Sequence, residues 1–367
     1  MGSTGVTTWL DKLEEQLNVD VDWMDPTFTK SLPIVPHDMT SNQLWVNEQM
    51  NHPDNQELFL NAVKEYKDEG WLAIYTRVAC LMCKENIGNI KGRVLLQVLP
   101  SNAYDSQKVL EHARLYAREF AKVGIPKDRF CIKIPSTGPA LSVCPILKEE
   151  GIATLGTALF SLPQAIAASQ AGCLYISPYY NEVRAHDDHS LWPNVEDPAT
   201  QHTMSPRIIQ MLETYRRLYK ETGKPQPLIK NASFINAKEA MAAGEMGCDS
   251  STISPEVLTE LSKLTYDGSK QPGEGVPKPT APNNQNTVPT PDRLKKIAAT
   301  DPLAPADWDG KLASTDVDYL ANNGAELAKA IAADPVTVQR LKDALELFTG
   351  GQNKSRAKIE EALKTLA

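Results

Sequence analysis

The sequence predicts an α/β fold, a (β/α)8 TIM barrel with additional C-terminal helices. Eight short apolar segments with strand character alternate along the chain with segments of helical periodicity. Such alternation implies parallel strands, and right-handed helical crossovers would close them into a barrel. The length of 367 residues suits a barrel with additions. An open doubly wound sheet is the alternative, but no Gly-x-Gly-x-x-Gly turn follows the first strand-like segment.

The expected elements follow one another in order. A polar, amphipathic helix covers residues 8–15. The strand-like segments end near Asp22, Asp38, Gln97, Lys133, Thr157, Ser177, Ser233 and Ser254. Between and after them, helical periodicity covers residues 54–69, 71–84, 105–122, 139–149, 161–171, 205–222, 236–246 and 255–263. These units form the expected catalytic barrel domain, residues 1–266.

After the last of these units the composition changes. Residues 267–305 are rich in Pro, Gly, Asn and Thr, which is typical of a long surface loop or linker. Helical periodicity returns over residues 317–333, 336–348 and 355–366. We expect this C-terminal region, residues 306–367, to pack on the barrel as helices without forming a separate domain.

The composition excludes several classes of function. A net charge of −8, without any dense run of Lys and Arg, argues against nucleic-acid binding. No apolar segment is long enough to span a bilayer, and the N-terminal helix does not resemble a signal peptide. Six cysteines are too few for a disulfide scaffold in a chain of this length, so we expect reduced thiols and a cytoplasmic protein.

One lysine stands inside an apolar strand. Residues 131–135 read Cys-Ile-Lys-Ile-Pro, which places Lys133 where the strand gives way to a loop. Burying an ammonium group is costly, and a buried lysine lowers that cost by losing its proton. The resulting amine is a nucleophile that can form a Schiff base with a carbonyl. The alternative is an edge-strand lysine whose amine stays in solvent.

Polar side chains gather at the ends of the predicted strands. Barrel enzymes build their sites at the carboxyl ends of the strands, and different strands supply different groups. Each of these residues alone could cap a turn or pack in the core, but their convergence around a lysine favours a catalytic site. They are Asp22, Asn42, Gln97, Lys133, Thr157, Ser177 and Tyr179.

The arrangement resembles the transaldolase family of class I, Schiff-base aldolases. Residues 132–137 (Ile-Lys-Ile-Pro-Ser-Thr) resemble the family's lysine strand, and residues 38–43 (Asp-Met-Thr-Ser-Asn-Gln) resemble its Asp-Ala-Thr-Thr-Asn-Pro segment. Residues 174–179 (Leu-Tyr-Ile-Ser-Pro-Tyr) resemble its sixth strand, and residues 231–234 (Asn-Ala-Ser-Phe) its seventh. The similarity runs in order from about residue 22 to residue 258, and weakly into the final helices.

The resemblance implies a role for each candidate residue. Lys133 would attack a ketose or ketone carbonyl and become the electron sink for carbon–carbon cleavage. Asp22 would act on a substrate hydroxyl, as general base for cleavage and as acid for addition. Thr157 would help to hold the water that relays protons. The dihydroxyacetone-like part of the substrate would be bound by Asn42, Ser177, Thr40 and Ser233.

Three positions depart from transaldolases proper. Gln97 stands where they carry a glutamate, Tyr179 where they usually have phenylalanine, and Leu155 where they place an asparagine. Gln97, Thr157 and Tyr179 together resemble the water-holding set of the fructose-6-phosphate aldolase branch. A tyrosine hydroxyl can both donate and accept at neutral pH. This favours simple aldol addition and cleavage over strict transfer.

The expected phosphate contacts also differ. Glu182 and Ile235 occupy positions where sugar-phosphate-binding members of the family carry arginines. A carboxylate repels a phosphate dianion, and an isoleucine side chain offers no donor. Arg184, Lys230 or Lys238 could compensate by reaching the phosphate. We expect instead that the acceptor is not phosphorylated.

The sequence thus predicts a lysine Schiff-base aldolase that joins a dihydroxyacetone-like ketone donor to an aldehyde acceptor, or cleaves the product. The alternatives are an ordinary transaldolase that transfers a dihydroxyacetone unit between sugar phosphates, and a catalytically idle barrel that acts as a binding protein. No cofactor or metal is expected, because the imine itself is the electron sink. The expected partners are small ketose, ketone and aldehyde molecules, with no nucleic acid and no membrane. The resemblance implies a homo-oligomer such as a dimer.

Three other features carry less weight. The Cys-x-x-Cys pair Cys80 and Cys83 lies in an apolar helical stretch, where core packing is expected. Residues 186–189 (His-Asp-Asp-His) lie in a polar loop that is expected to overhang the barrel mouth as a lid or specificity loop, with metal binding as the weaker alternative. Trp45 is expected in the core, and Trp23 either there or beside the substrate.

Overall fold

A curled parallel sheet forms the centre of the molecule. The computed structural model describes residues 6–267 and 288–366. Seven strands pair in the order β1-β7-β6-β5-β4-β3-β2, and every neighbouring pair is parallel. The α/β fold with a parallel sheet is therefore confirmed. The strands are β1 (Asn18–Val21), β2 (Val94–Gln97), β3 (Phe130–Pro135), β4 (Thr154–Leu159), β5 (Tyr175–Pro178), β6 (Leu228–Asn231) and β7 (Ser250–Ile253).

The eighth strand predicted near Asp38 is reduced to one bridging residue. Met39 lies between the two edge strands and makes a parallel bridge with Val21 of β1 and another with Val94 of β2. Backbone hydrogen bonds nevertheless continue around Met39: His37 and Thr40 donate to β1, and Met39 donates to Arg93, directly before β2. The Asp38 N–H donates instead to the side chain of Asp20 (3.0 Å). Soon after Met39 the chain turns into a helix.

The helices predicted from periodicity are present with slightly different bounds. They are α1 (Trp9–Gln16), α4 (Gln56–Glu65), α5 (Trp71–Asn86), α6 (Ser106–Lys122), α9 (Leu162–Gln170), α11 (Ser205–Thr222), α12 (Ala237–Met246) and α13 (Pro255–Lys263). Side-chain caps fix several of their starts: Asp105 accepts from the Lys108 N–H of α6, and Asn236 accepts from the Glu239 N–H of α12.

Other helices differ from the prediction. The predicted helix over residues 139–149 is split into α7 (Gly138–Leu141) and α8 (Cys144–Glu149). Three further helices had no clear periodic pattern. They are α2 (Pro26–Ser31), α3 (Gln43–Asn51) and α10 (Pro198–Gln201).

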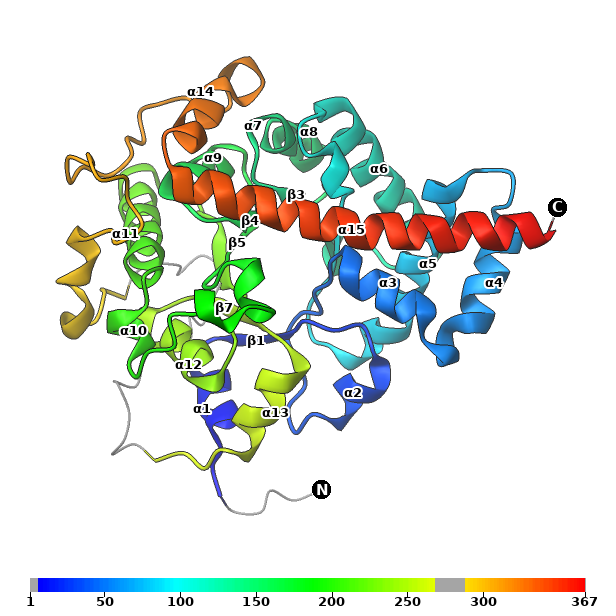
Figure 1. Cartoon of the computed structure of the whole chain (residues 1–367), viewed down its shortest axis with the longest axis horizontal. Coiled ribbons are helices and arrows are strands. Elements are labelled where there is room, and N and C mark those ends of the chain that lie inside the picture. The colour runs from blue at the N-terminus through cyan, green and yellow to red at the C-terminus, as the bar shows by residue number, and fades with distance from the viewer. Residues whose placement is uncertain (1–5, 268–287, 367) are drawn as a thin grey trace.

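The C-terminal region contains α14 (Ala321–Ala332) and one long helix, α15 (Pro335–Leu366). The prediction of two helices over residues 336–348 and 355–366 was wrong. Gly351 does not break the helix. It allows α15 to approach α3 closely, because a Cβ at this position would lie only 2.9 Å from the backbone of Gln43 and Leu44. Figure 1 shows α15 crossing in front of the strands, with α14 beside α7 and α9.

Part of the predicted linker also contacts the sheet-covering helices. Residues 268–287 of that segment lie outside the described residues. Further along, Leu294 is buried, and Asp301 forms an ion pair with Arg207 of α11 (3.0 Å). All six cysteines are free and buried. Among the helices in the described ranges, we find none with the length and apolarity needed to cross a bilayer.

Inside the curl of the sheet, side chains from neighbouring strands form layers. Four of them make a small apolar cluster, consisting of Leu95, Cys131, Leu155 and Tyr175. Side chains alternate between the two faces of a strand, so the residue two positions later points the same way. The next layer towards the carboxyl ends therefore comes from Gln97, Lys133, Thr157 and Ser177. In the register of β2 and β3, Gln97 lies directly beside Lys133.

Candidate active site

A cavity of about 270 Å³ opens at the carboxyl ends of the strands. This is the end at which parallel α/β barrels bind their ligands. Of the side chains predicted from the sequence to form the site, six line the cavity. These are Asp22, Asn42, Lys133, Ser177, Tyr179 and Ser233. Its volume is slightly below the roughly 300–1,000 Å³ typical of pockets for drug-sized ligands, which suits small substrates.

Lys133 has the environment of a nucleophilic amine. Its side chain is 5% exposed, and Nζ donates to the backbone carbonyl of Ser41 at 2.9 Å. Burial lowers the pKa of Lys133 below its usual value, and the negative charge of Asp22 only partly opposes this effect. More of the amine is therefore neutral at a given pH than in an exposed lysine.

Asp22 is held by two donors at the end of β1. Thr40 donates its hydroxyl to Oδ1 at 2.6 Å, and the Trp45 indole donates to Oδ2 at 3.1 Å. The prediction of a core position for Trp45 was wrong, because this ring is only partly buried and lines the cavity. Trp23 packs edge-on against Trp45, with ring centroids 5.3 Å apart. Thr40 is not among the lining residues and reaches the site through Asp22.

Asn42 is positioned by the helix that it caps. Its Oδ1 accepts from the backbone N–H groups of Leu44 (2.9 Å) and Trp45 (3.2 Å) at the start of α3. With the oxygen engaged, the amide NH₂ group is the part of Asn42 that can donate to a ligand. Ser177 adds a hydroxyl to the cavity wall from β5.

A pair of hydroxyl groups lies beside the lysine strand. Thr157 of β4 and Tyr179, just after β5, share a hydrogen bond of 3.0 Å. Burial raises the pKa of Tyr179 to about 12, so its hydroxyl stays protonated at neutral pH. Gln97 is 2% exposed, and neither polar atom of its side chain has a hydrogen-bond partner among the described residues. Neither Thr157 nor Gln97 is among the residues that line the cavity.

Ser233 connects the cavity to the loop after β5. Its backbone is left-handed (φ 66°), a costly conformation for a residue with a side chain. The hydroxyl donates to the Asn181 carbonyl at 2.9 Å, so it accepts from Nε2–H of His186 at 2.8 Å. His186 is exposed at the cavity mouth, and partial desolvation by its neighbours there lowers its pKa, which favours a neutral ring.

The cavity carries little positive charge. Besides Lys133, the acidic and histidine side chains of its lining are Asp22, Asp187, Glu256 and His186, and the described part of the wall contains no arginine. The three cations proposed above to replace the family's arginines are engaged elsewhere. They form ion pairs between Arg184 and Asp343 (3.8 Å), Lys238 and Glu196 (2.6 Å), and Lys230 and Asp20 (2.7 Å).

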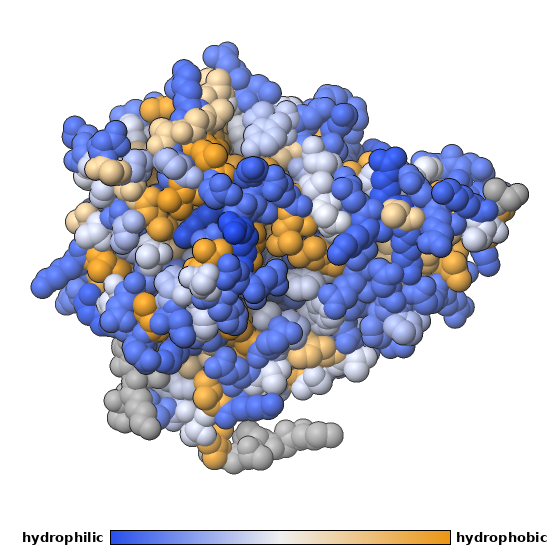
Figure 2. Space-filling view, viewed as in Figure 1, coloured by the Kyte–Doolittle hydropathy of each residue, from blue (hydrophilic) through white to orange (hydrophobic). Residues whose placement is uncertain are grey.

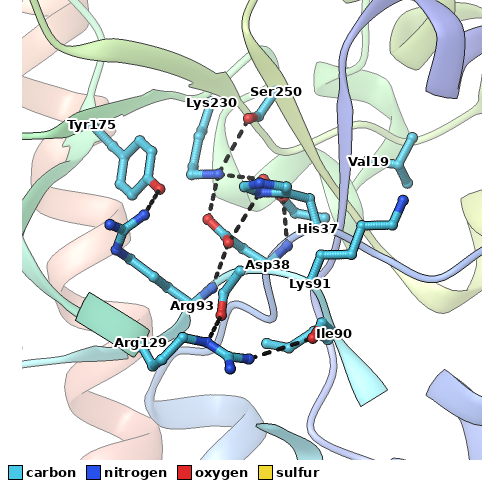
Figure 3. A network of polar contacts seen from close by, with 12 residues as sticks. Val19, His37, Asp38, Ile90, Lys91, Arg93, Arg129, Tyr175, Lys230 and Ser250 are labelled. Atoms are coloured by element: carbon cyan, nitrogen blue, oxygen red, sulfur yellow. Dashed lines mark hydrogen bonds and ion pairs between the residues drawn. The ribbon is translucent and has the colours of Figure 1, made fainter. Parts of the chain in front are cut away.

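Lys230 belongs to a buried network below the cavity. Its amine lies 2.7 Å from Asp20. Figure 3 shows its contacts with Asp38 (2.8 Å) and with the Ser250 hydroxyl (3.2 Å). Burial alone would favour the neutral amine, but the two carboxylates raise the pKa of Lys230, so it stays charged. Asp20, His37 and Asp38 place three possible metal ligands within 4.8 Å of one another. Lys230 already supplies the positive charge there.

A family model described as Transaldolase/Fructose-6-phosphate aldolase matches residues 15–302. The chain belongs to this family of enzymes. A protein named transaldolase from Prochlorococcus marinus (strain MIT 9211) is 29% identical over 257 residues, which cover 66% of this chain and 72% of that protein. A transaldolase from Synechocystis sp. (strain ATCC 27184 / PCC 6803 / Kazusa) is 27% identical over 349 residues, which cover 90% of this chain and 75% of that protein. A transaldolase from Allorhizobium ampelinum (strain ATCC BAA-846 / DSM 112012 / S4) is 31% identical over 268 residues, which cover 71% of this chain and 81% of that protein.

Several residues of this transaldolase-family cavity were not predicted from the sequence. Leu347 and Phe348 reach it from α15, and Leu44 from α3. Their apolar character gives no signal distinct from that of core residues. Glu256 follows β7 by three positions, so the rule that strand ends carry site residues could have found it.

Proposed function

We propose that this transaldolase-family enzyme is a class I aldolase in which Lys133 forms a Schiff base with a dihydroxyacetone-like ketone. The acceptor is an aldehyde that is not phosphorylated. The observation that carries the proposal is the buried amine of Lys133, whose pKa is lowered, in a cavity that also contains the carboxylate of Asp22. A nucleophile and a proton acceptor at the same strand ends are what imine chemistry requires.

The proposed cycle begins when Nζ of Lys133 attacks the ketone carbonyl. The carbinolamine loses water to give the protonated imine, and the adjacent carbon then gives up a proton, which Asp22 accepts, to form the enamine. That carbon attacks the aldehyde carbonyl, a carbon–carbon bond forms, and Asp22 in its protonated form gives a proton to the new alkoxide. Water then hydrolyses the imine and restores the amine. In the cleavage direction, Asp22 accepts the proton of the same hydroxyl.

Gln97, Thr157 and Tyr179 are proposed to hold the water that enters and leaves at the imine. The hydrogen bond between Thr157 and Tyr179 and the unpartnered amide of Gln97 beside Lys133 support this role. A protonated tyrosine can both donate to and accept from such a water. This set is the basis for placing the enzyme with the fructose-6-phosphate aldolase branch.

The donor ketone is proposed to hydrogen-bond to three side chains of the cavity wall. Asn42 contributes its amide NH₂ group, and Ser177 and Ser233 contribute hydroxyl oxygens. Ser233 already donates to the Asn181 carbonyl, so it would accept from a substrate hydroxyl. Thr40 is proposed to act on the substrate only through Asp22, to which it donates.

The absence of a phosphate from the acceptor is supported by the charges of the wall. Asp187 and Glu256 are exposed at the cavity and would repel a dianion. The other candidate function is ordinary transaldolase transfer between sugar phosphates, which the names of the three relatives favour. It would require cations that the described wall does not supply.

The architecture that we propose is a closed (β/α)8 barrel over residues 1–266, with Met39 standing for the eighth strand through its bridges to β1 and β2. Residues 267–305 connect it to the C-terminal helices of residues 306–367, which complete the same domain. The six free cysteines are consistent with a cytoplasmic enzyme. By analogy with the family, we propose a homo-oligomer such as a dimer.

Borohydride trapping tests the proposal. The protein is incubated separately with dihydroxyacetone and with fructose 6-phosphate, reduced, and mapped by mass spectrometry. We expect a three-carbon adduct on Lys133 from free dihydroxyacetone, none in Lys133→Met, and the wild-type adduct in Lys238→Met as a matched control. A three-carbon adduct formed efficiently from fructose 6-phosphate would instead support the transaldolase alternative. No adduct from either ketone would contradict Schiff-base chemistry and favour an idle barrel.

A further inference from the structure

The cavity lining contains an apolar set and a polar set of side chains. The apolar set comes from three segments that are far apart in sequence and includes Leu44, Val183, Leu347 and Phe348. These residues belong to one apolar cluster that continues into the buried face of α15. The polar set beyond the strand ends consists of His186, Asp187, Ser254 and Glu256. Figure 2 shows apolar surface at the centre of this face, beside α15, with hydrophilic surface around it.

The apolar set is part of the rigid structure. Gly351 brings α15 against the backbone of α3, at Gln43 and Leu44. One residue later, Gln352 donates to the Ser101 hydroxyl in the loop after β2 (2.8 Å). Phe348 is 4% exposed and packs in the apolar cluster with Val183 and Tyr179. The helix is thus attached both to α3 and to the loop after β2, and this part of the lining is formed before any ligand binds.

The hydrogen-bonding side chains of the cavity come from the strand ends and the loops that follow them, and the two lining residues from α15, Leu347 and Phe348, offer none. A hydroxylated or phosphorylated acceptor chain directed towards α15 would lose its hydrogen bonds to water and gain none from Leu347 or Phe348, which is costly. An alkyl chain in the same place would gain from leaving water.

We propose that the acceptor aldehyde carries an apolar chain, which packs against Leu347 and Phe348 while its carbonyl faces the donor held on Lys133. This inference rests on the proposed Schiff-base aldol reaction and specifies its substrate class. The atoms balance as in that reaction: one carbon–carbon bond forms between the donor enamine and the aldehyde carbon, and the alkoxide takes a proton. The chain itself undergoes no chemistry.

The test compares kcat/KM for addition of dihydroxyacetone to ethanal, propanal and butanal, with glyceraldehyde 3-phosphate as the phosphorylated acceptor. Burial of each methylene should raise kcat/KM about fourfold until the cavity is filled. Leu347→Asn should lower the butanal-to-ethanal ratio of kcat/KM about tenfold. Val338→Asn is the matched control, because Val338 lies on the same helix, is 41% exposed and does not line the cavity. It should leave the ratio unchanged.

The outcomes separate this inference from the reaction on which it rests. If dihydroxyacetone is trapped on Lys133 but kcat/KM is independent of chain length, or is highest for glyceraldehyde 3-phosphate, the aldolase stands and the apolar acceptor is refuted. An equal loss of the ratio in Leu347→Asn and Val338→Asn would also refute it. If no ketone is trapped on Lys133, the proposed function fails and the acceptor assignment fails with it.

Discussion

Replacing Lys230 with methionine removes the one ammonium group that faces Asp20 and Asp38. All three side chains are fully buried, and methionine keeps a long unbranched side chain in the same space. Removing one partner of a buried ion pair typically costs about 3–5 kcal/mol, because the remaining charge is left without compensation. Here two carboxylates would remain. We therefore expect Lys230→Met to lower the free energy of unfolding by at least about 3 kcal/mol at pH 8.

The loss of unfolding free energy in Lys230→Met should depend on pH in a defined direction. Burial raises the pKa of Asp20 to about 6 even with Lys230 present, from an ordinary value of 3.8. Without the lysine, the pKa values of this carboxylate pair must rise further in the folded state. The folded variant then binds protons that both the unfolded chain and the folded wild type release, so its stability relative to the wild type falls as the pH rises through the window above about 6. The destabilisation by Lys230→Met should therefore become smaller as the pH is lowered through that window. The expected change is about 1.4 kcal/mol per pH unit for each proton bound.

Urea unfolding followed by circular dichroism at pH 8 and pH 5.5 measures both effects. Lys238→Met is the control, because its ion pair with Glu196 is exposed and should contribute about 0–1 kcal/mol. Adding Asp20→Asn and Asp38→Asn to Lys230→Met should restore part of the stability, since no buried charge is then left unpaired. A loss below about 1 kcal/mol at pH 8, or a triple variant less stable than the single one, would refute the reasoning.

Three further predictions concern the cavity and its support. Tyr179→Phe removes the hydroxyl that bonds to Thr157, and steady-state kinetics should show kcat reduced about 100-fold with the fold retained; an unchanged kcat would remove Tyr179 from the proton relay. The rate of borohydride trapping at Lys133 should rise about tenfold per pH unit and level off below the ordinary lysine pKa of 10.5, because burial lowers the pKa of this amine; a plateau at or above 10.5 would show an ordinary, solvated lysine. Gly351→Ala should lower the melting temperature, because its Cβ would lie 2.9 Å from the backbone of Gln43, whereas Gly350→Ala meets nothing within 4 Å and should stabilise α15 by up to about 1 kcal/mol. Equal effects at the two glycines would contradict the close approach of α15 to α3.

Local signals explain which helices could be predicted. Asp105 and Asn236 cap α6 and α12, and each cap stands directly before a periodic apolar pattern. In contrast, α3 has no strong apolar face, and its start depends on Asn42. The predicted break between residues 348 and 355 is absent, and Gly351 within that stretch is explained by a neighbour more than 300 positions earlier in the chain. Sequence periodicity contains no information about such a contact.

The candidate site likewise contains residues that local sequence signals reveal and residues that depend on contacts between distant segments. Lys133 and Ser177 could be found because strands end at the cavity and their alternation fixes which side chains point into it. Trp45 was misplaced because an aromatic ring near a strand end gives no sign of whether its N–H has a carboxylate to bind. Leu347 and Phe348 could not be found at all, because helical periodicity shows which residues are buried but not what they are buried against.

The residues that surround the amine and the apolar residues that α15 adds to the cavity lie far apart in the chain. Lys133 lies on β3 and Asp22 directly after β1, whereas Leu347 and Phe348 belong to α15, which contributes no strand to the sheet. Substitutions at these two positions of α15 alter the apolar lining of the cavity while leaving the strand ends in place. Mutation and selection can therefore act on the apolar lining without disturbing the residues that surround the amine.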